Sequence, residues 1–129
     1  MNDYNDLFDE NEKLIDLTLI HKTFMNFSSR YWKPSTDIYE TDDDVIVYVE
    51  LAGMEKNKIH LQFQKGFLLI SGFRKQFHSE GITVTHQMEI DTGRFLRKIK
   101  INIDILEDDI KAEYREGILK ITLPKRRTE

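Results

Sequence analysis

Apolar and polar residues alternate with a period of two from Asp37 onward, and this alternation constrains the fold more than any other feature of the sequence. Because successive side chains of a β-strand point to opposite faces, each alternating run predicts a strand with a buried face. The runs follow one another at spacings of about ten residues, which is typical of two packed antiparallel sheets. The alternating runs are Ile59–Gln64, Ile82–Ile90, Phe95–Ile105, Ile110–Tyr114 and Ile118–Leu123. Val45–Leu51 is apolar on both faces, which suits a strand buried on both sides, and Phe67–Gly72 is a short apolar run after a break at Lys65-Gly66. We therefore expect an all-β antiparallel sandwich of about seven or eight strands, with open edges where another chain can pair.

The segment before Lys33-Pro34 has a different composition. Residues 1–33 contain six of the fourteen aromatic residues of the chain and begin with an acidic stretch. Five of their apolar residues fit a loose helical period: Leu7, Leu14, Leu17, Ile20 and Phe24. Other apolar residues spread the apolar surface around the same helix, so the pattern indicates an imperfectly amphipathic helix. We expect a short N-terminal tail, partly helical or disordered, whose apolar surface is not fully buried in its own subunit.

Charge and composition exclude several classes of protein. The formal net charge of -4 provides no general attraction for nucleic acid or anionic membranes, so we expect neither as a partner. No run of about 18 apolar residues is present to form a membrane-spanning helix. The chain has no cysteine, and its acidic first residues lead into no long apolar run, which argues against a secretory signal. We expect a soluble cytoplasmic protein.

The sequence contains no motif for catalysis or metal binding. Its six glycines are too widely spaced for a dinucleotide or phosphate loop, and no Gly-x-Ser-x-Gly nucleophile motif occurs. The four histidines lack the close spacing of a zinc site, and Asp42-Asp43-Asp44 lacks the other ligands of a calcium-binding loop. We interpret these aspartates as a charged turn and Lys125-Arg126-Arg127 as a solvated end. We therefore expect no enzyme, no catalytic or metal-binding residue and no cofactor.

Five segments, taken in order, resemble the motifs of one known family. Trp32–Thr41 resembles the opening of an α-crystallin domain, and Leu51-Ala52-Gly53-Met54 stands where that domain has a Leu-Pro-Gly-hydrophobic turn. Phe67–Lys75 is similar to its Leu-x-Ile-x-Gly-x-Arg strand, and Gly93–Arg97 is similar to its Gly-x-Phe-x-Arg motif. Ala112–Leu119 is similar to its Ala-x-x-x-x-Gly-hydrophobic-Leu signature. The chain is thereby identified as a member of the small heat-shock protein family.

The resemblance implies three parts. These are an N-terminal tail over residues 1–33, an α-crystallin domain with an immunoglobulin-like sandwich over residues 34–125, and a very short C-terminal tail over residues 126–129. It also implies an ATP-independent holdase, which binds unfolding client proteins and prevents their aggregation. The expected client-binding residues of the tail are Phe8, Leu17, Leu19, Phe24, Phe27 and Trp32. The alternative is that the tail packs on its own sandwich.

The resemblance further implies a homodimer made by strand exchange. The loop from Gln76 to Glu89 would carry a short strand to an edge of the partner's sandwich. The expected strand consists of Ile82, Thr83, Val84, Thr85, His86 and Gln87. It would pair with Ile38 and Tyr39 of the other chain and so cover an open edge. The alternative is an ordinary hairpin strand within one subunit.

Family members generally assemble through an Ile-x-Ile or Ile-x-Val motif on a C-terminal extension, which docks in a groove of a neighbouring subunit. No apolar residue follows Pro124, so we do not expect large assemblies built in this way. The residues expected to line the groove are Ile59, Leu61, Phe63, Ile110, Ala112 and Tyr114. The groove would receive a partner or Leu17-Thr18-Leu19 of the tail, unless a bulky residue such as Tyr114 closes it.

One alternative function belongs to a different class of protein from the holdase chaperones. The chain could be a structural or adaptor protein, such as a spore-coat-like component or a subunit that co-assembles with another small heat-shock protein. The lack of an apolar residue after Pro124 favours this alternative. Protection of clients without nucleotide distinguishes a holdase from a scaffold.

Overall fold

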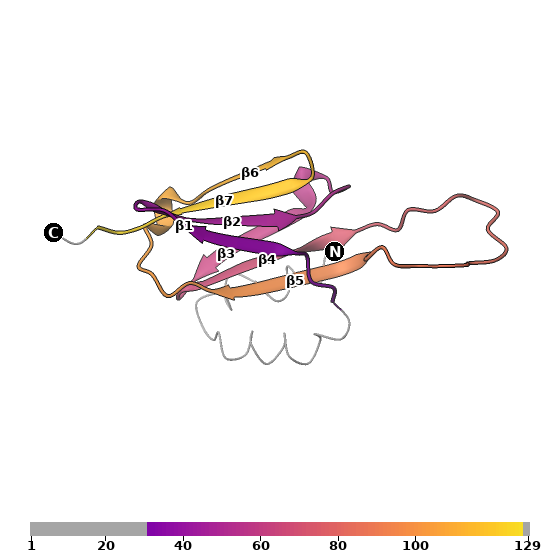
Figure 1. Ribbon diagram of the computed structural model, residues 1–129, viewed down its shortest axis with the longest axis horizontal. Coiled ribbons are helices and arrows are strands. Elements are labelled where there is room, and N and C mark those ends of the chain that lie inside the picture. Colours follow the sequence, from indigo (N-terminus) through magenta and orange to yellow (C-terminus); the bar gives the residue numbers. More distant parts are fainter. Residues whose placement is uncertain (1–30, 128–129) are drawn as a thin grey trace.

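The computed structural model describes residues 31–127, which form a sandwich of two antiparallel sheets (Figure 1). The four-stranded sheet has the order β1 (Thr36–Glu40), β2 (Asp44–Glu50), β7 (Ile118–Pro124), β6 (Lys111–Arg115). The three-stranded sheet has the order β3 (Ile59–Gln64), β4 (Phe67–Arg74), β5 (Gly93–Lys100). Two short 3-10 helices, η2 (Lys56–Lys58) and η3 (Glu107–Asp109), precede β3 and β6. The expected all-β sandwich is confirmed, whereas most of the expected N-terminal tail, residues 1–30, lies outside the described residues.

Alternate residues of the strands fill the space between the two sheets. The buried core residues of the four-stranded sheet are Val45, Val47, Val49, Leu119, Ile121 and Leu123. Those of the three-stranded sheet are Leu68, Ile70, Phe95 and Ile99. At Gly72 in β4, an added Cβ would lie 2.7 Å from Cζ of Phe95 and 2.8 Å from the carbonyl oxygen of Lys58. Real Cβ atoms do not approach so closely, so the Phe95 ring occupies space that only a glycine at position 72 leaves open.

Two tight turns set the register of two hairpins. Lys65 and Gly66 both have positive φ angles, and so do Glu116 and Gly117. Two successive residues with positive φ form the turn that best matches the twist of a two-residue hairpin. The turns join β3 to β4 and β6 to β7, pairing Gln64 with Phe67 and Arg115 with Ile118. These two turns thereby fix which residues face each other across the two hairpins.

The apolar run from Phe95 to Ile105 is not one strand, as the alternation had indicated. Strand β5 ends at Lys100, and the backbone N–H of Ile101 donates to the carbonyl of Gly66 at 2.8 Å. The chain then crosses to the other sheet, where Ile105 forms an isolated bridge with Lys125. Ile101 and Ile105 both remain buried in the core. The period of two continues through the crossing because odd-numbered residues face the core both before and after it.

The side chain of Tyr114 connects β6 to the turn after β2. Its hydroxyl donates to the carbonyl of Leu51 at 2.5 Å and accepts a hydrogen bond from the backbone N–H of Met54 at 3.2 Å. The turn between these residues contains Gly53, which has a φ of 77°. A single partly buried hydroxyl therefore satisfies two backbone groups of an irregular segment.

We expect Tyr114→Phe to lower the free energy of unfolding by about 1–2 kcal/mol, because two partly buried backbone groups lose their partner. Urea unfolding monitored by fluorescence measures the change. Tyr39→Phe is the matched control, since the exposed Tyr39 hydroxyl makes only a 3.4 Å contact with Asp37. The two substitutions would have equal effects if the Tyr114 hydroxyl contributed nothing to stability.

Candidate functional site

A long loop, residues 75–92, connects β4 to β5 and projects from one end of the sandwich (Figure 1). Every residue from Lys75 to Asp91 is exposed. Its large apolar residues are 52% to 69% exposed, and four of them occupy even positions: Ile82, Val84, Met88 and Ile90. Polar residues occupy most of the odd positions between them, so an extended conformation would have one apolar face. Residues 82–90 pair with none of the described residues, although their pattern is that of a strand.

Arg74 holds the two ends of this loop together. Its Nε and Nη2 donate to the carbonyl of Asp91 at 2.9 and 2.5 Å, and its Nη1 donates to the carbonyl of Ala52 at 3.2 Å. The guanidinium also lies 4.2 Å from the centroid of the Trp32 ring. One side chain thus connects the start of the loop to its end and to the turn after β2.

Trp32 is a packed residue of the domain in this structure. Its indole N–H donates to the carbonyl of Gly93 at 3.1 Å, and its ring centroid lies 5.2 Å from that of Phe95. The ring is therefore largely engaged by the sandwich and by Arg74, whereas the sequence placed Trp32 among the client-binding residues of the tail. The other five expected tail residues, from Phe8 to Phe27, lie outside the described residues.

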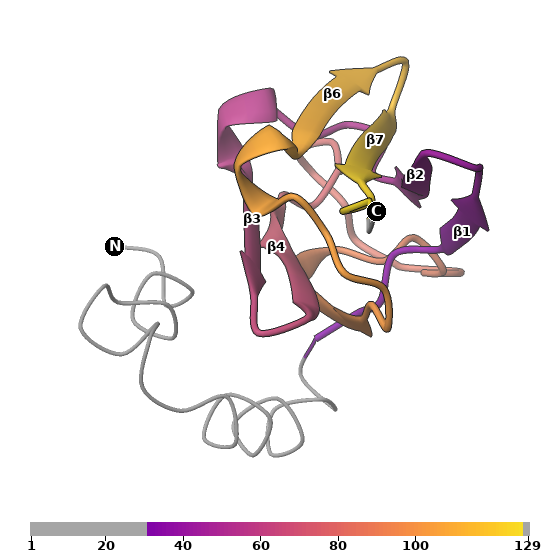
Figure 2. The same ribbon diagram turned by 90° about the vertical axis from the view of Figure 1, so that its left-hand side faces the viewer.

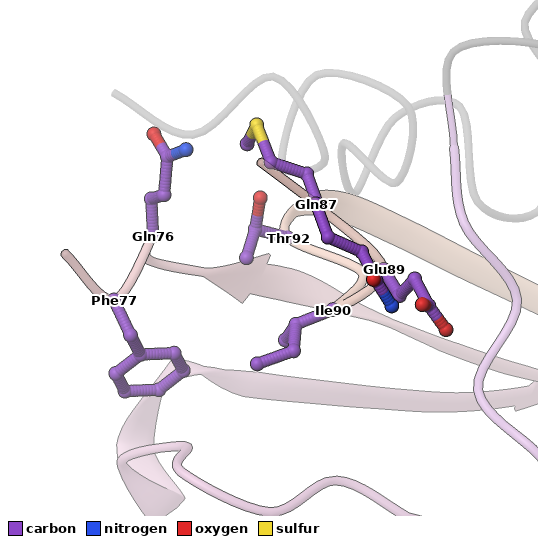
Figure 3. A pocket seen from close by; sticks show the side chains of 7 residues that line it. Gln76, Phe77, Gln87, Glu89, Ile90 and Thr92 are labelled. Carbon is purple, nitrogen blue, oxygen red and sulfur yellow. The ribbon is translucent and has the colours of Figure 1, made fainter. Parts of the chain in front are cut away.

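Apolar side chains also gather where the loop meets the sandwich. A pocket of about 120 Å³ is lined by Gln76, Phe77, Gln87, Met88, Glu89, Ile90 and Thr92 (Figure 3). These residues come from both arms of the loop, and the Phe77 ring lies on the same side as Ile90 (Figure 3). A Cβ on Gly53 would lie 2.7 Å from Cζ of Phe77, so the ring rests directly on this glycine. The base of the loop is thus held in place by apolar packing as well as by Arg74.

Strand β1 is an exposed edge of the four-stranded sheet. Only β2 is hydrogen-bonded to it among the described residues. Ile38 pairs with the buried Val47 and so faces the core side, yet it is 48% exposed. The second sheet has only three strands and does not extend beneath β1 (Figure 2). Tyr39 is 55% exposed on the opposite face, so β1 presents both apolar side chains and unpaired backbone groups.

The strands expected to form the peptide groove, β3 and β6, are each an edge of their sheet, and they lie along one side of the sandwich (Figure 2). Five of the six expected residues are partly buried and pack against the core: Ile59, Leu61, Phe63, Ile110 and Tyr114. The sixth, Ala112, pairs with the buried Ile121 and shares its face, but is exposed. Apolar surface is therefore accessible along this side, while the groove itself stays a prediction.

Sequence reasoning assigned no role to Arg74 or to Phe77. Arg74 is the last residue of the Leu-x-Ile-x-Gly-x-Arg segment, so the motif identified it without indicating its contacts. Its partner is a backbone carbonyl seventeen positions later, and no residue type marks such an acceptor.

Within residues 31–127, no group of three or more His, Cys, Asp or Glu side chains is arranged to hold a metal ion. That part of the chain also has no helix long and apolar enough to cross a membrane.

Comparison with known proteins agrees with these features. The profile of the Hsp20/alpha crystallin family matches residues 37–129. The chain is 39% identical over 93 residues to heat shock protein HSP.16.4 of Streptococcus thermophilus, a match that covers 70% of this chain and 64% of that protein. It is 32% identical over 98 residues to a probable 15 kDa heat shock protein of Leptospira interrogans, covering 76% of this chain and 74% of the relative. The chain thus spans less than two thirds of the length of the Streptococcus protein.

Solved structures show the same architecture. A small heat-shock protein of Xylella fastidiosa, solved in a distinct high-order structure, superposes with a TM-score of 0.68 at 32% identity. That superposition covers 76% of this chain and 90% of the Xylella chain. Heat shock protein 16.0 of Schizosaccharomyces pombe gives a TM-score of 0.65 at 34% identity, covering 76% of this chain and 94% of that one. The sandwich, its motifs and these matches together show that the chain belongs to the small heat-shock protein family.

Proposed function

We propose that this protein is an ATP-independent holdase chaperone, which binds non-native polypeptides and prevents their aggregation. The observation that carries the proposal is the match of residues 37–129 to the small heat-shock protein family, in a domain that keeps apolar surface accessible along β3 and β6. Large exposed apolar surface usually marks a site of interaction with another chain. Holding a client requires no reacting group, which agrees with a sequence that contains no nucleotide-binding or nucleophile motif. The absence of cysteine suits a reducing compartment, and we include a cytoplasmic location in the proposal.

The tail contributes to client binding in this proposal through Phe8, Leu17, Leu19, Phe24 and Phe27. The full chain should suppress the aggregation of a heated client protein at near-stoichiometric ratios without nucleotide, as measured by light scattering.

Phe24→Ser with Phe27→Ser should weaken client binding by about tenfold or more, because burying each phenylalanine contributes ~1.5–3 kcal/mol. Asn5→Ser with Asn26→Ser is the matched control. A full chain that gives no protection would favour the structural or adaptor function instead, and equal protection by both variants would remove the tail from the client site.

Strand exchange in a homodimer is the second part of the proposal. Residues 82–87 have the pattern of a strand but pair with none of the described residues, and β1 has an open edge with Ile38 and Tyr39 exposed. Pairing the two across a dimer would satisfy the backbone groups of both and cover their apolar side chains. The Arg74 contacts support this arrangement, because they hold the base of the loop in a defined direction.

Proline substitution tests the exchange. The N–H groups of successive strand residues point to opposite sides, so either Val84→Pro or Thr85→Pro must remove a ladder donor. The variant in which proline replaces the paired N–H should raise the dissociation constant of the dimer by about tenfold or more. A lost hydrogen bond and an unpaired backbone group cost about 1–3 kcal/mol. Sedimentation across a range of concentrations measures this change, with Ser79→Pro in the same loop as the control. Unchanged dimers in both variants would contradict the exchange.

The third part is that the side formed by β3 and β6 docks an apolar peptide, supplied by a partner subunit or by Leu17-Thr18-Leu19. Its support is the row of partly buried apolar residues along both edges, with Ala112 exposed between Ile110 and Tyr114. The hydroxyl of Tyr114 is bonded to Leu51 and Met54, and Ala112 on the same face of β6 is exposed.

A labelled Ile-x-Ile peptide should therefore bind the full chain, as measured by fluorescence polarisation. Ala112→Trp should weaken binding by about tenfold or more, because the large ring would fill the space between the strands. Glu113→Trp adds the same ring one residue away, where the side chain points to the opposite face, and should change binding little. No binding, or equal effects of the two substitutions, would exclude this surface as the docking site.

A further inference from the structure

The basic residues that follow β7 are fixed to the sandwich by their backbone. The N–H of Lys125 donates to the carbonyl of Asp43 at 2.8 Å, and the N–H of Arg126 donates to the carbonyl of Asp104, also at 2.8 Å. Lys125 also forms the isolated bridge with Ile105. The chain here lies between the β1–β2 turn on one side and the segment that crosses between the sheets on the other. For Lys125, the interpretation of this segment as a solvated end is therefore wrong.

The side chain of Lys125 binds the end of β1. Its Nζ lies 2.7 Å from Oε1 of Glu40, the last residue of β1, and donates to the carbonyl of Thr41 at 2.6 Å. The Lys125 side chain is 20% exposed, so water competes less for its ammonium group than for that of a fully exposed lysine. Two acceptors on neighbouring residues, one of them charged, fix the direction of this contact. Lys125 thus holds the point at which β1 ends.

The turn that follows β1 is closed by its own hydrogen bonds. Oγ1 of Thr41 accepts from the backbone N–H groups of Asp43 and Asp44 at 3.3 and 2.9 Å, and the N–H of Thr41 donates to the carbonyl of Asp44 at 2.8 Å. A threonine hydroxyl that bonds nearby backbone groups in this way stabilises a turn. Arg127 pairs with the carboxylate of Asp43. The turn and Lys125 therefore form one connected unit.

Strand β1 has little else to hold it. Among the described residues it is hydrogen-bonded only to β2, and the three-stranded sheet does not extend beneath it (Figure 2). Ile38 is therefore 48% exposed, whereas the β2 residues that face the same way, Val45, Val47 and Val49, are buried. Segments with few buried apolar contacts open locally at low cost in free energy. A contact at the end of β1 is thus important for keeping this strand in place.

The Lys125 contact is separate from loop 75–92. The β1–β2 turn lies at the opposite end of the sandwich from this loop (Figure 1). Arg74 and Phe77, which hold the base of the loop, make contacts at the loop's end of the sandwich, with Ala52 and Gly53. A change at Lys125 therefore alters the edge that would receive a partner strand and leaves the base of the loop as it is.

We propose that Lys125 is a positioning residue for strand exchange between two copies of this chain. Through Glu40 and Thr41 it holds β1 in the direction in which the open edge receives residues 82–87 of the partner. The inference rests on the homodimer of the proposed function, and it adds a residue that lies outside both pairing segments. Because the hold includes an ion pair, salt weakens the dimer by screening that pair.

Hydrogen exchange of β1 tests the hold without any dimer. Lys125→Met keeps the aliphatic stem of the side chain and removes its ammonium group. It is made in a full chain that also carries Val84→Pro and Thr85→Pro, so that no partner strand covers β1. Amide exchange over residues 36–44, measured by mass spectrometry, should be about threefold faster or more, since the end of β1 then opens locally. Exchange over β4 should stay the same, which shows that the sandwich remains folded.

Arg126→Met is the matched control. It removes the same charge from the next residue, whose exposed side chain lies 3.4 Å from the carboxylate of Asp104. Exchange over residues 36–44 should then equal that of the chain with the natural Arg126. Should exchange over β4 rise in Lys125→Met, Glu40→Gln replaces it, because this variant removes only the ion pair. Equal rates over residues 36–44 in the test variant and in Arg126→Met would overturn the proposal.

Sedimentation across a range of concentrations measures the consequence for the dimer in chains with the natural loop. Lys125→Met should raise the dissociation constant by about threefold or more, and Arg126→Met should change it little. High salt should weaken the natural dimer more than the Lys125→Met dimer. An unchanged dimer in Lys125→Met, alongside dimers weakened by proline at position 84 or 85, would overturn this proposal alone. Dimers that the prolines also leave unchanged would remove strand exchange, and this proposal with it.

Discussion

The contact between Phe95 and Gly72 is the one on which the end of the molecule that carries loop 75–92 depends. The Phe95 ring occupies the space that any side chain at position 72 would need, and this close approach holds β4 against β5. Trp32 packs against the same ring, and Arg74 lies over Trp32 while it donates hydrogen bonds to the carbonyls of Asp91 and Ala52. The entry of the chain and the base of loop 75–92 are thus positioned by one continuous stack of side chains.

The unequal width of the two sheets explains where the exposed apolar surface lies. A fourth strand extends beyond the three-stranded sheet, so Ile38 faces the core side without being covered. On the other side, β3 and β6 leave apolar residues only partly buried between them. A sandwich closed on all sides would have no such edges, and edges with unpaired backbone groups are the places where other chains add strands. The architecture that stabilises the domain therefore also leaves open the edges to which the proposed function assigns association.

Local signals predicted most of the strands correctly. The range Ile59–Gln64 is β3 residue for residue, because alternation depends on neighbouring residues alone. The end of β5 could not be predicted, since Ile101 and Ile105 stay buried after the chain has left the sheet. The role of Arg74 could not be predicted either, because its acceptors are backbone carbonyls distant in sequence.

The sequence by itself determined most of the strand segments, the five family motifs and hence the membership in the small heat-shock proteins. The tertiary structure alone decided which apolar residues are buried. Leu61 and Val84 stand in equally alternating segments, yet Leu61 packs against the core and Val84 is 66% exposed on the loop. Leu69 points away from the core and is buried nonetheless. Alternation tells which residues share a face of a strand, but the stacking of segments distant in sequence decides whether anything covers that face.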